Sequence, residues 1–157
     1  YRDTARETED AEALVIDDEG DFSIISENET SLSSLDTSSI AQIISFGPAL
    51  IEDGEISVDA SSEVSQSMTS NPRTAIGQIS PLHYIIIVSD GRTDESEGFS
   101  LLQLAEEMQN RGAVTAYNLD GGGSSTLYFN GEIINKPTSG NSTGEREVSD
   151  IVYIGYE

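Results

Sequence analysis

Residues 84–123 read YIIIVSDGRTDESEGFSLLQLAEEMQNRGAVTAYNLDGGG, and this stretch decides the fold. It contains two short apolar runs, at about 84–89 and 113–118, that have the length and the β-branched content of strands. Between them, a helix is predicted at about 100–111, because apolar residues recur there at helical spacing. That apolar stripe consists of Leu101, Leu104, Ala105 and Met108.

Signals at both ends bound the predicted helix. Ser100 and Gln103 have the spacing of a capping box, and Gly112 is a C-terminal stop. A strand, a helix and a second strand within about 35 residues form a βαβ unit, in which the crossover makes the strands parallel. The first strand is continuously apolar, which predicts a central strand covered on both faces. The turns that include Asp90 and Asp120 should then open on one edge of the sheet, where open α/β sheets bind ligands.

The rest of the chain predicts antiparallel hairpins. Apolar runs flank turn residues at 13–25, 49–58, 74–89 and 126–135. Further strands are expected at 41–46 and 148–154. The predicted fold class is α/β of the mixed α+β kind: a mixed β-sheet with one βαβ unit and several β-hairpins. With 157 residues, the chain is expected to form a single domain over 1–157.

Charge and composition exclude several functional classes. Seven basic residues against 29 acidic ones give a net charge of −22, so no nucleic-acid partner is expected. Cysteine is absent, which excludes disulfides, Cys-ligated zinc and thiol nucleophiles. No apolar run reaches the roughly 18 residues of a membrane span. The one histidine, His83, lies beside a predicted turn and is assigned a structural role, so a His-rich metal site and a Ser-His-Asp triad are unfavourable.

The sequence NLDGGGSST at 118–126 is the sharpest candidate for a site. Three consecutive glycines adopt dihedrals closed to other residues, and their amides can form a concave nest for an anion such as phosphate. The spacing is neither that of a P-loop nor that of GxGxxG, and the alternative is a flexible connection into the next hairpin. With no suitable base for a nucleophile, the serines are predicted to donate hydrogen bonds to a ligand. The predicted binding residues here are Asn118, Gly121, Gly122, Gly123, Ser124 and Ser125.

Positive charge is scarce, so its placement is informative. In so acidic a protein an anionic substrate needs local arginines, because the planar guanidinium group can donate two parallel hydrogen bonds to a phosphate. Arg73, in NPRT, and Arg146, before the last predicted strand, are candidate substrate ligands. A salt bridge is an equal alternative for Arg146, and it is the favoured interpretation for Arg92.

Two carboxylates follow the predicted strands at this edge, Asp90 and Asp120. Two carboxylates near an acetal carbon can divide the acid, base and nucleophile roles of glycoside hydrolysis. The alternative is a divalent cation, such as calcium, bound by these residues with help from Asp94, Glu95 or Glu97. The spacing of that acidic run is not that of an EF-hand, which favours a solvated loop.

Five motifs together resemble the phosphodiester glycosidase family. In chain order they are SFGPAL at 45–50, NPRTAIG at 71–77, VSDGR at 88–92, NLDGGGSST at 118–126 and REVSD at 146–150. The resemblance implies a hydrolase that cleaves the bond between the anomeric carbon of a sugar and phosphate in a sugar-1-phosphodiester. It also implies a bacterial protein, extracellular or in the cell envelope, whose substrate is a glycan. Further N-terminal strands are usual in the family, so residues 1–157 are expected to lack the N-terminal part of the domain.

The resemblance also places a site on these motifs. It implies that the site contains Asp90 and Asp120, and our hypothesis takes Asp120 as the leading catalytic carboxylate and Asp90 as its partner or as a metal ligand. The implied binding residues are Arg73, Asn118, Gly121, Gly122, Gly123, Ser124, Ser125 and Arg146. Two alternatives stay open: a non-catalytic carbohydrate or cell-wall binding module that uses the same Gly-rich cleft, and a calcium-stabilised structural domain. The patterns leave the sugar and the oligomeric state open.

Overall fold

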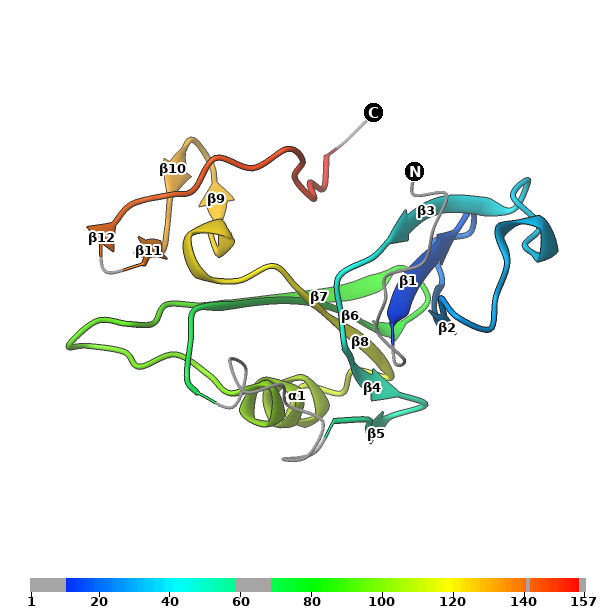
Figure 1. Cartoon of the computed structure of the whole chain (residues 1–157), viewed down its shortest axis with the longest axis horizontal. Coiled ribbons are helices and arrows are strands. Elements are labelled where there is room, and N and C mark those ends of the chain that lie inside the picture. Colours follow the sequence, from blue (N-terminus) through cyan, green and yellow to red (C-terminus); the bar gives the residue numbers. More distant parts are fainter. Residues whose placement is uncertain (1–10, 59–68, 141, 156–157) are drawn as a thin grey trace.

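The structure is a computed structural model that describes residues 11–58, 69–140 and 142–155 (Figure 1). In this part of the chain no helix is long and apolar enough to cross a membrane. The elements follow one another as β1 (Glu12–Asp17), β2 (Phe22–Ser26), η1 (Leu32–Ser34), β3 (Ile40–Ile44), β4 (Ala49–Glu52), β5 (Glu55–Ile56), β6 (Arg73–Ser80), β7 (His83–Ser89), α1 (Leu101–Asn110), β8 (Thr115–Leu119), η2 (Gly122–Ser124), β9 (Tyr128–Phe129), β10 (Glu132–Ile133), β11 (Thr138–Ser139) and β12 (Ser142–Thr143).

The main sheet has five strands in the order β5-β4-β8-β6-β7. β6 pairs antiparallel with both β7 and β8, so those two strands run in the same direction, as the βαβ unit requires. They are not neighbours, because β6 lies between them. Every pairing between the described strands is antiparallel. The predicted α+β class with hairpins is therefore confirmed. The two strands that run in the same direction, β7 and β8, lie on either side of β6 and not next to each other.

The prediction that the strand at 84–88 is central is wrong. β7 lies at the edge of the sheet, whereas β4, β8 and β6 have neighbours on both sides and mostly buried residues. Ile85 and Ile87 pack against the core under the helix, whereas Ile86 is 38% exposed. A continuous apolar run shows that a strand is partly buried, but it does not show which place the strand takes in a sheet.

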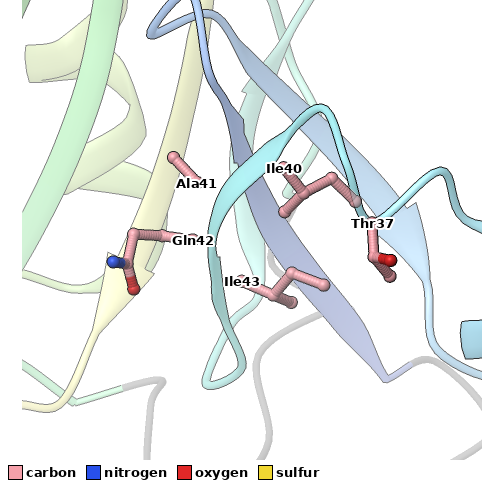
Figure 2. A pocket seen from close by; sticks show the side chains of 5 residues that line it. All are labelled: Thr37, Ile40, Ala41, Gln42 and Ile43. Carbon is pink, nitrogen blue, oxygen red and sulfur yellow. The ribbon is translucent and has the colours of Figure 1, made fainter.

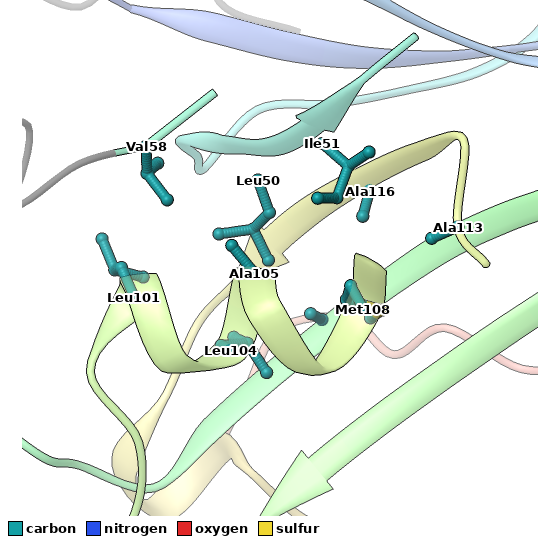
Figure 3. Close-up of a cluster of buried hydrophobic side chains, with 10 residues drawn as sticks. Leu50, Ile51, Val58, Leu101, Leu104, Ala105, Met108, Ala113 and Ala116 are labelled. Atoms are coloured by element: carbon teal, nitrogen blue, oxygen red, sulfur yellow. The ribbon is translucent and has the colours of Figure 1, made fainter. Parts of the chain in front are cut away.

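Helix α1 and a second, smaller sheet pack against opposite faces of the main sheet. The first core lies under the helix, where Leu104, Ala105 and Met108 contact Leu50 and Ala116 (Figure 3). The helix begins as predicted, since the Ser100 side chain accepts a hydrogen bond from Gln103 N and the Gln103 side chain accepts one from Ser100 N. Gly112 then ends it with φ +85°.

The smaller sheet, in the order β2-β1-β3, packs on the other face of the main sheet through a core of Leu14, Ala49, Ile76 and Tyr117. One buried amide fastens the two sheets together. Phe22 N donates to Gln78 Oε1 at 2.9 Å, and Gln78 Nε2 donates to Asp21 Oδ1 at 2.8 Å. The Phe22 ring also stacks on Tyr84, with 5.1 Å between ring centroids.

The smaller sheet carries a shallow apolar hollow of about 290 Å³ beside β3 (Figure 2). It is lined by Thr37, Ile40, Ala41, Gln42 and Ile43. None of these residues was predicted to bind a ligand, and all belong to one short stretch of chain. This hollow therefore does not mark the predicted site.

Of two structural predictions for the C-terminal part of the chain, one is confirmed and one is wrong. The predicted hairpin turn at Asn130-Gly131 is confirmed, with φ +49° and φ +93° between β9 and β10. The strand predicted at 148–154 is wrong, because those residues form no strand and are exposed. The segment ends in an apolar run at 151–154 that is typical of a strand, but no described strand pairs with it.

A first prediction concerns Glu52 at the end of β4. Partial burial raises the pKa of its carboxyl group, and the neighbouring carboxylates of Glu12 and Asp53 raise it further. A raised pKa means that ionisation above that pKa costs folding stability. Glu52→Gln should therefore raise the melting temperature at pH 7 by about 1–2 °C, since the site is partly solvated. The gain should vanish at about pH 3.5, where the carboxyl is protonated in both the folded and the unfolded chain.

Scanning calorimetry at both pH values tests this. Glu132→Gln, on the exposed strand β10, is the matched control for the loss of one negative charge. An equal gain from both variants, or a gain from Glu52→Gln that persists at low pH, contradicts the prediction.

Candidate active site

Three strand ends meet at one edge of the main sheet. Arg73 pairs with Ser89, and its neighbour Thr74 pairs with Leu119. Asp90 and Asp120 follow these strand ends directly, so both turns open on the same edge, as the sequence predicts. Because β6 separates β7 from β8, the two turns leave the sheet about 10 Å apart.

Pro72 lies between the two turns, and glycines allow them to pack against it. A Cβ on Gly91 would lie 2.6 Å from Pro72 N, and one on Gly121 would lie 2.6 Å from Pro72 O. A third glycine, Gly98, packs against the preceding residue, Asn71, which also forms a β-bridge with Phe99. Two loops distant in sequence, the β7–α1 connection and the turn after β8, thus converge on Asn71 and Pro72.

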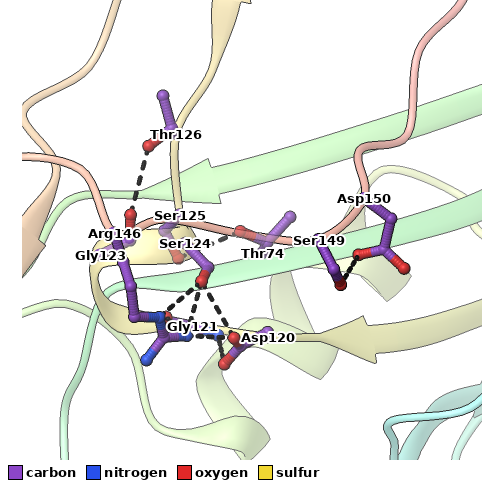
Figure 4. Close-up of polar contacts among 10 residues, drawn as sticks. All are labelled: Thr74, Asp120, Gly121, Gly123, Ser124, Ser125, Thr126, Arg146, Ser149 and Asp150. Carbon is purple, nitrogen blue, oxygen red and sulfur yellow. Dashed lines mark hydrogen bonds and ion pairs between the residues drawn. The ribbon is translucent and has the colours of Figure 1, made fainter.

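Asp120 is the accessible carboxylate of this edge, and its orientation is fixed (Figure 4). Its Oδ1 accepts from Gly121 N at 2.8 Å, and its Oδ2 accepts from Ser124 Oγ at 2.9 Å. Oδ2 also forms an ion pair with Arg146, whose guanidinium donates to Ser124 Oγ as well. The side chains of Asp120 and Arg146 remain 48% and 45% exposed. Three predicted residues therefore form one connected, solvent-accessible cluster.

In the glycine turn, two of the amides that the predicted anion nest would use are already bonded. Gly121 N is bonded to the Asp120 carboxylate, Gly122 N to Pro72 O, and Ser124 N to Gly121 O. The glycines are explained by packing and backbone: Gly122 has φ +63°, and a Cβ on Gly123 would lie 2.7 Å from the Ser139 Cβ. The turn thus uses its own amides to hold its shape and to hold Asp120.

Asp90 faces the segment that follows the β9–β10 hairpin. Its Oδ1 accepts from Asn135 Nδ2 at 3.0 Å and from Lys136 N at 2.7 Å. Asn135 Nδ2 also donates to Ser125 O at 2.7 Å. Through Asn135, the turn after β7 is therefore tied to the turn after β8, although the two carboxylates do not share a hydrogen-bond partner in the described residues.

Five of the predicted binding residues are buried: Gly122 and Gly123 in the turn, and Arg73, Asn118 and Ser125 beneath this edge. Arg73 is 8% exposed, and its guanidinium donates to Phe99 O at 3.0 Å. Ser125 is 0% exposed and accepts from Thr74 Oγ1 at 3.0 Å. Asn118 is 3% exposed and donates to Gly47 O at 2.8 Å, while its Oδ1 is buried without a partner within the described residues. These contacts support the walls of the site.

Arg92 is the residue at this edge that sequence reasoning missed. It was assigned to a salt bridge, but the partner is an amide: Nε and Nη2 donate to Asn71 Oδ1 at 3.1 Å and 2.8 Å. Arg92 is exposed, and its Nη1 lies 3.4 Å from the position that a Cβ on Gly122 would occupy. Its backbone φ of +59° is unusual for a non-glycine residue, yet no sequence pattern signals that conformation.

Positive charge concentrates here in an acidic protein. Four of the seven basic residues lie at this edge: Arg73, Arg92, Lys136 and Arg146. Lys136 forms an ion pair with Glu95, which raises the pKa of its ammonium group. Two of these cations pair with carboxylates at the same edge, Lys136 with Glu95 and Arg146 with Asp120, and the net charge of −22 repels an anion at a distance.

The predicted calcium site has no ligand set in the part of the chain that the structure describes. No group of three or more His, Cys, Asp or Glu side chains that could hold a metal ion occurs there. Asp90 accepts from two N–H groups, and Glu95 and Asp120 pair with cations.

The family described as phosphodiester glycosidase has a sequence model that matches residues 2–155. A Bacillus subtilis (strain 168) protein, the SPbeta prophage-derived uncharacterized protein YomE, is 31% identical over 146 residues, which is 93% of this chain and 22% of that protein. The mouse enzyme N-acetylglucosamine-1-phosphodiester alpha-N-acetylglucosaminidase is 39% identical over 66 residues, which is 42% of this chain and 13% of the enzyme.

Two solved structures share the fold. The zebrafish catalytic domain of the same enzyme, auto-inhibited by its pro-peptide, superposes with a TM-score of 0.63 at 26% identity, covering 89% of this chain and 47% of that one. A hypothetical protein from Synechocystis superposes with a TM-score of 0.53 at 20% identity, covering 87% of this chain and 33% of that one. The present chain thus spans less than half of each of these structures and about a fifth of the Bacillus protein.

Proposed function

Because this chain belongs to the phosphodiester glycosidase family, we propose that it hydrolyses the bond between the anomeric carbon of a sugar and the phosphate of a sugar-1-phosphodiester. The observation that carries the proposal is the Asp120 carboxylate, exposed and held by Ser124 and Arg146. It lies at the sheet edge where the basic residues concentrate.

The chemistry of the leaving group fits these residues. The oxygen of water bonds to the anomeric carbon, the bond from that carbon to the phosphate oxygen breaks, phosphate leaves as a monoester with the electron pair, and the proton that the water loses is released to solvent. A phosphate monoester has a second pKa of about 6, so it departs without a strong general acid. The one histidine is not needed, and it lies at the far end of β7 from Ser89.

The carboxylates supply the negative charge that the reaction requires. The transition state resembles an oxocarbenium ion, which a fixed carboxylate beside the anomeric carbon stabilises. Asp120 is the proposed leading catalytic group, since it is accessible and rigidly oriented. Asp90 is its proposed partner, and it also positions Lys136 through the backbone N–H.

A finer proposal is that the substrate is an extracellular or envelope glycan of a bacterium. The Bacillus subtilis relative supports a bacterial setting. The arginines at the site support a substrate that carries phosphate.

The test is turnover. The full chain is incubated with an N-acetylglucosamine 1-phosphodiester and, in parallel, with a simple alkyl N-acetylglucosaminide that lacks phosphate. We expect free sugar and a phosphate monoester, in equal amounts, from the phosphodiester only. Binding of the phosphodiester by calorimetry without release of sugar overturns the proposal, and it supports the alternative of a carbohydrate-binding module that uses the same edge.

A further inference from the structure

We propose that Arg92 binds the phosphate group of the substrate beside the turn at 121–123, with Asn71 as the residue that positions its guanidinium. This inference rests on the proposed function, because it names the group that receives the phosphate. It assigns the phosphate to an arginine that the sequence patterns placed in a salt bridge.

The first step of the argument is that Arg92 is held but not neutralised. A guanidinium has five N–H donors, and two of them go to the Asn71 Oδ1 atom. Within residues 11–58, 69–140 and 142–155, no carboxylate pairs with it. In a chain with 29 acidic residues, an exposed arginine with an amide as its partner retains its full charge for another anion.

The second step is that Asn71 is itself fixed. Its Nδ2 donates to Thr69 O at 2.8 Å, which leaves Oδ1 facing Arg92. Its backbone is bridged to Phe99 in both directions, at 3.1 Å and 3.0 Å. An arginine that is oriented before the ligand arrives loses less conformational entropy on binding.

The third step is the location. Arg92 Nη1 lies against Gly122, and Arg146 Nη2 donates to Gly121 O at 3.3 Å. Two guanidinium groups therefore contact the turn that carries Asp120 on its N-terminal side. A phosphate at Arg92 would place the attached sugar near that carboxylate, which is the arrangement that cleavage at the anomeric carbon requires.

The fourth step is the backbone of Arg92. Its φ of +59° lies in the region that glycine adopts without cost. Strained non-glycine residues cluster at functional sites, where the side chain is what the position requires. Glycine would relax the backbone at position 92 but would remove the guanidinium.

The test measures phosphate binding and turnover separately. Inorganic phosphate is titrated into the full chain by NMR, and the KM for an N-acetylglucosamine 1-phosphodiester is measured in parallel. Arg92→Gln should weaken phosphate binding and raise the KM by roughly 10- to 100-fold, the usual effect of losing a charge-assisted hydrogen bond. Asn71→Ala should raise the KM by a smaller factor with kcat little changed, because it loosens the guanidinium without removing it.

Two further variants are controls. Arg111→Gln removes the same charge from the surface of α1, where Arg111 pairs with Glu107, and it should leave phosphate binding unchanged. Arg92→Gly should lose phosphate binding while the chain stays folded, which separates a binding role from a structural one. Circular dichroism melting checks the fold of each variant.

The outcomes separate this inference from the proposed function. If Arg92→Gln binds phosphate as tightly as the wild type, or if the wild type binds none, the inference is overturned even where turnover is observed. If the wild type binds phosphate but shows no turnover, and the Arg92→Gln variant no longer binds phosphate, the anion site stands and the proposed reaction is overturned.

Discussion

Asp120→Asn is expected to lower turnover of a sugar-1-phosphodiester by roughly 10³-fold, the scale on which fixed electrostatic groups act in catalysis. The amide retains the shape of the side chain but loses the negative charge that faces the developing positive charge at the anomeric carbon. The amide can also present N–H groups toward Arg146, which in the wild type pairs with the Asp120 carboxylate. The measurement is kcat/KM from the release of free sugar.

The fold should survive this substitution. Asp120 and Arg146 are each about half exposed, and exposed ion pairs contribute only about 0–1 kcal/mol to stability. Asp18→Asn, in the exposed turn between β1 and β2, makes the same chemical change away from the site and should retain full turnover. Turnover by Asp120→Asn within tenfold of the wild type would remove this residue from the proposed mechanism.

Gly98→Ala is expected to destabilise the chain by roughly 2–5 kcal/mol, the sum of a backbone cost and a packing cost. One part, about 1–2 kcal/mol, comes from a side chain at φ +93°. A further 1–3 kcal/mol or so comes from overlap of the new Cβ with the carbonyl group of Asn71, which must move. Urea unfolding followed by circular dichroism measures the change in the free energy of unfolding.

Gly131→Ala separates these two contributions. Gly131 has the same φ of +93°, but nothing lies within 4 Å of where its Cβ would be. It should therefore cost only the backbone part, about 1–2 kcal/mol. Equal losses of unfolding free energy in the two variants would contradict the close packing of Gly98 on Asn71. Because Asn71 also holds Arg92, residual folded Gly98→Ala should bind phosphate more weakly than Gly131→Ala.

Local elements were predictable because their signals lie in adjacent residues. The capping box at Ser100 and the turn at Asn130-Gly131 depend on side chains and dihedrals within four residues of each other, and both are confirmed. The strand predicted at 148–154 failed for the opposite reason. A strand exists only when another strand supplies its hydrogen bonds, and a short apolar run does not specify that partner.

The same distinction applies to the candidate site. The sequence alone indicated that Asp90 and Asp120 open on one edge, since the crossover rule for βαβ units orients both strand ends. It did not indicate that Arg73, Asn118 and Ser125 are buried, because burial depends on which loops cover the sheet edge. Nor did it indicate that Arg92 bonds the Asn71 amide and not a carboxylate, since Asn71 is 21 residues away in the sequence.

What the sequence determined by itself is the kind of molecule: an acidic α+β chain with its chemistry-bearing residues on the turns after two strands that run in the same direction. Periodicity, turn residues and motif spacing are local properties, so they can be recognised without coordinates. Only the tertiary structure decided which of these residues reach solvent, and that the Gly121 amide bonds the Asp120 carboxylate. Those outcomes depend on close contacts between Pro72 and the two turns that flank it, and such contacts exist only after long-range packing has brought the strands together.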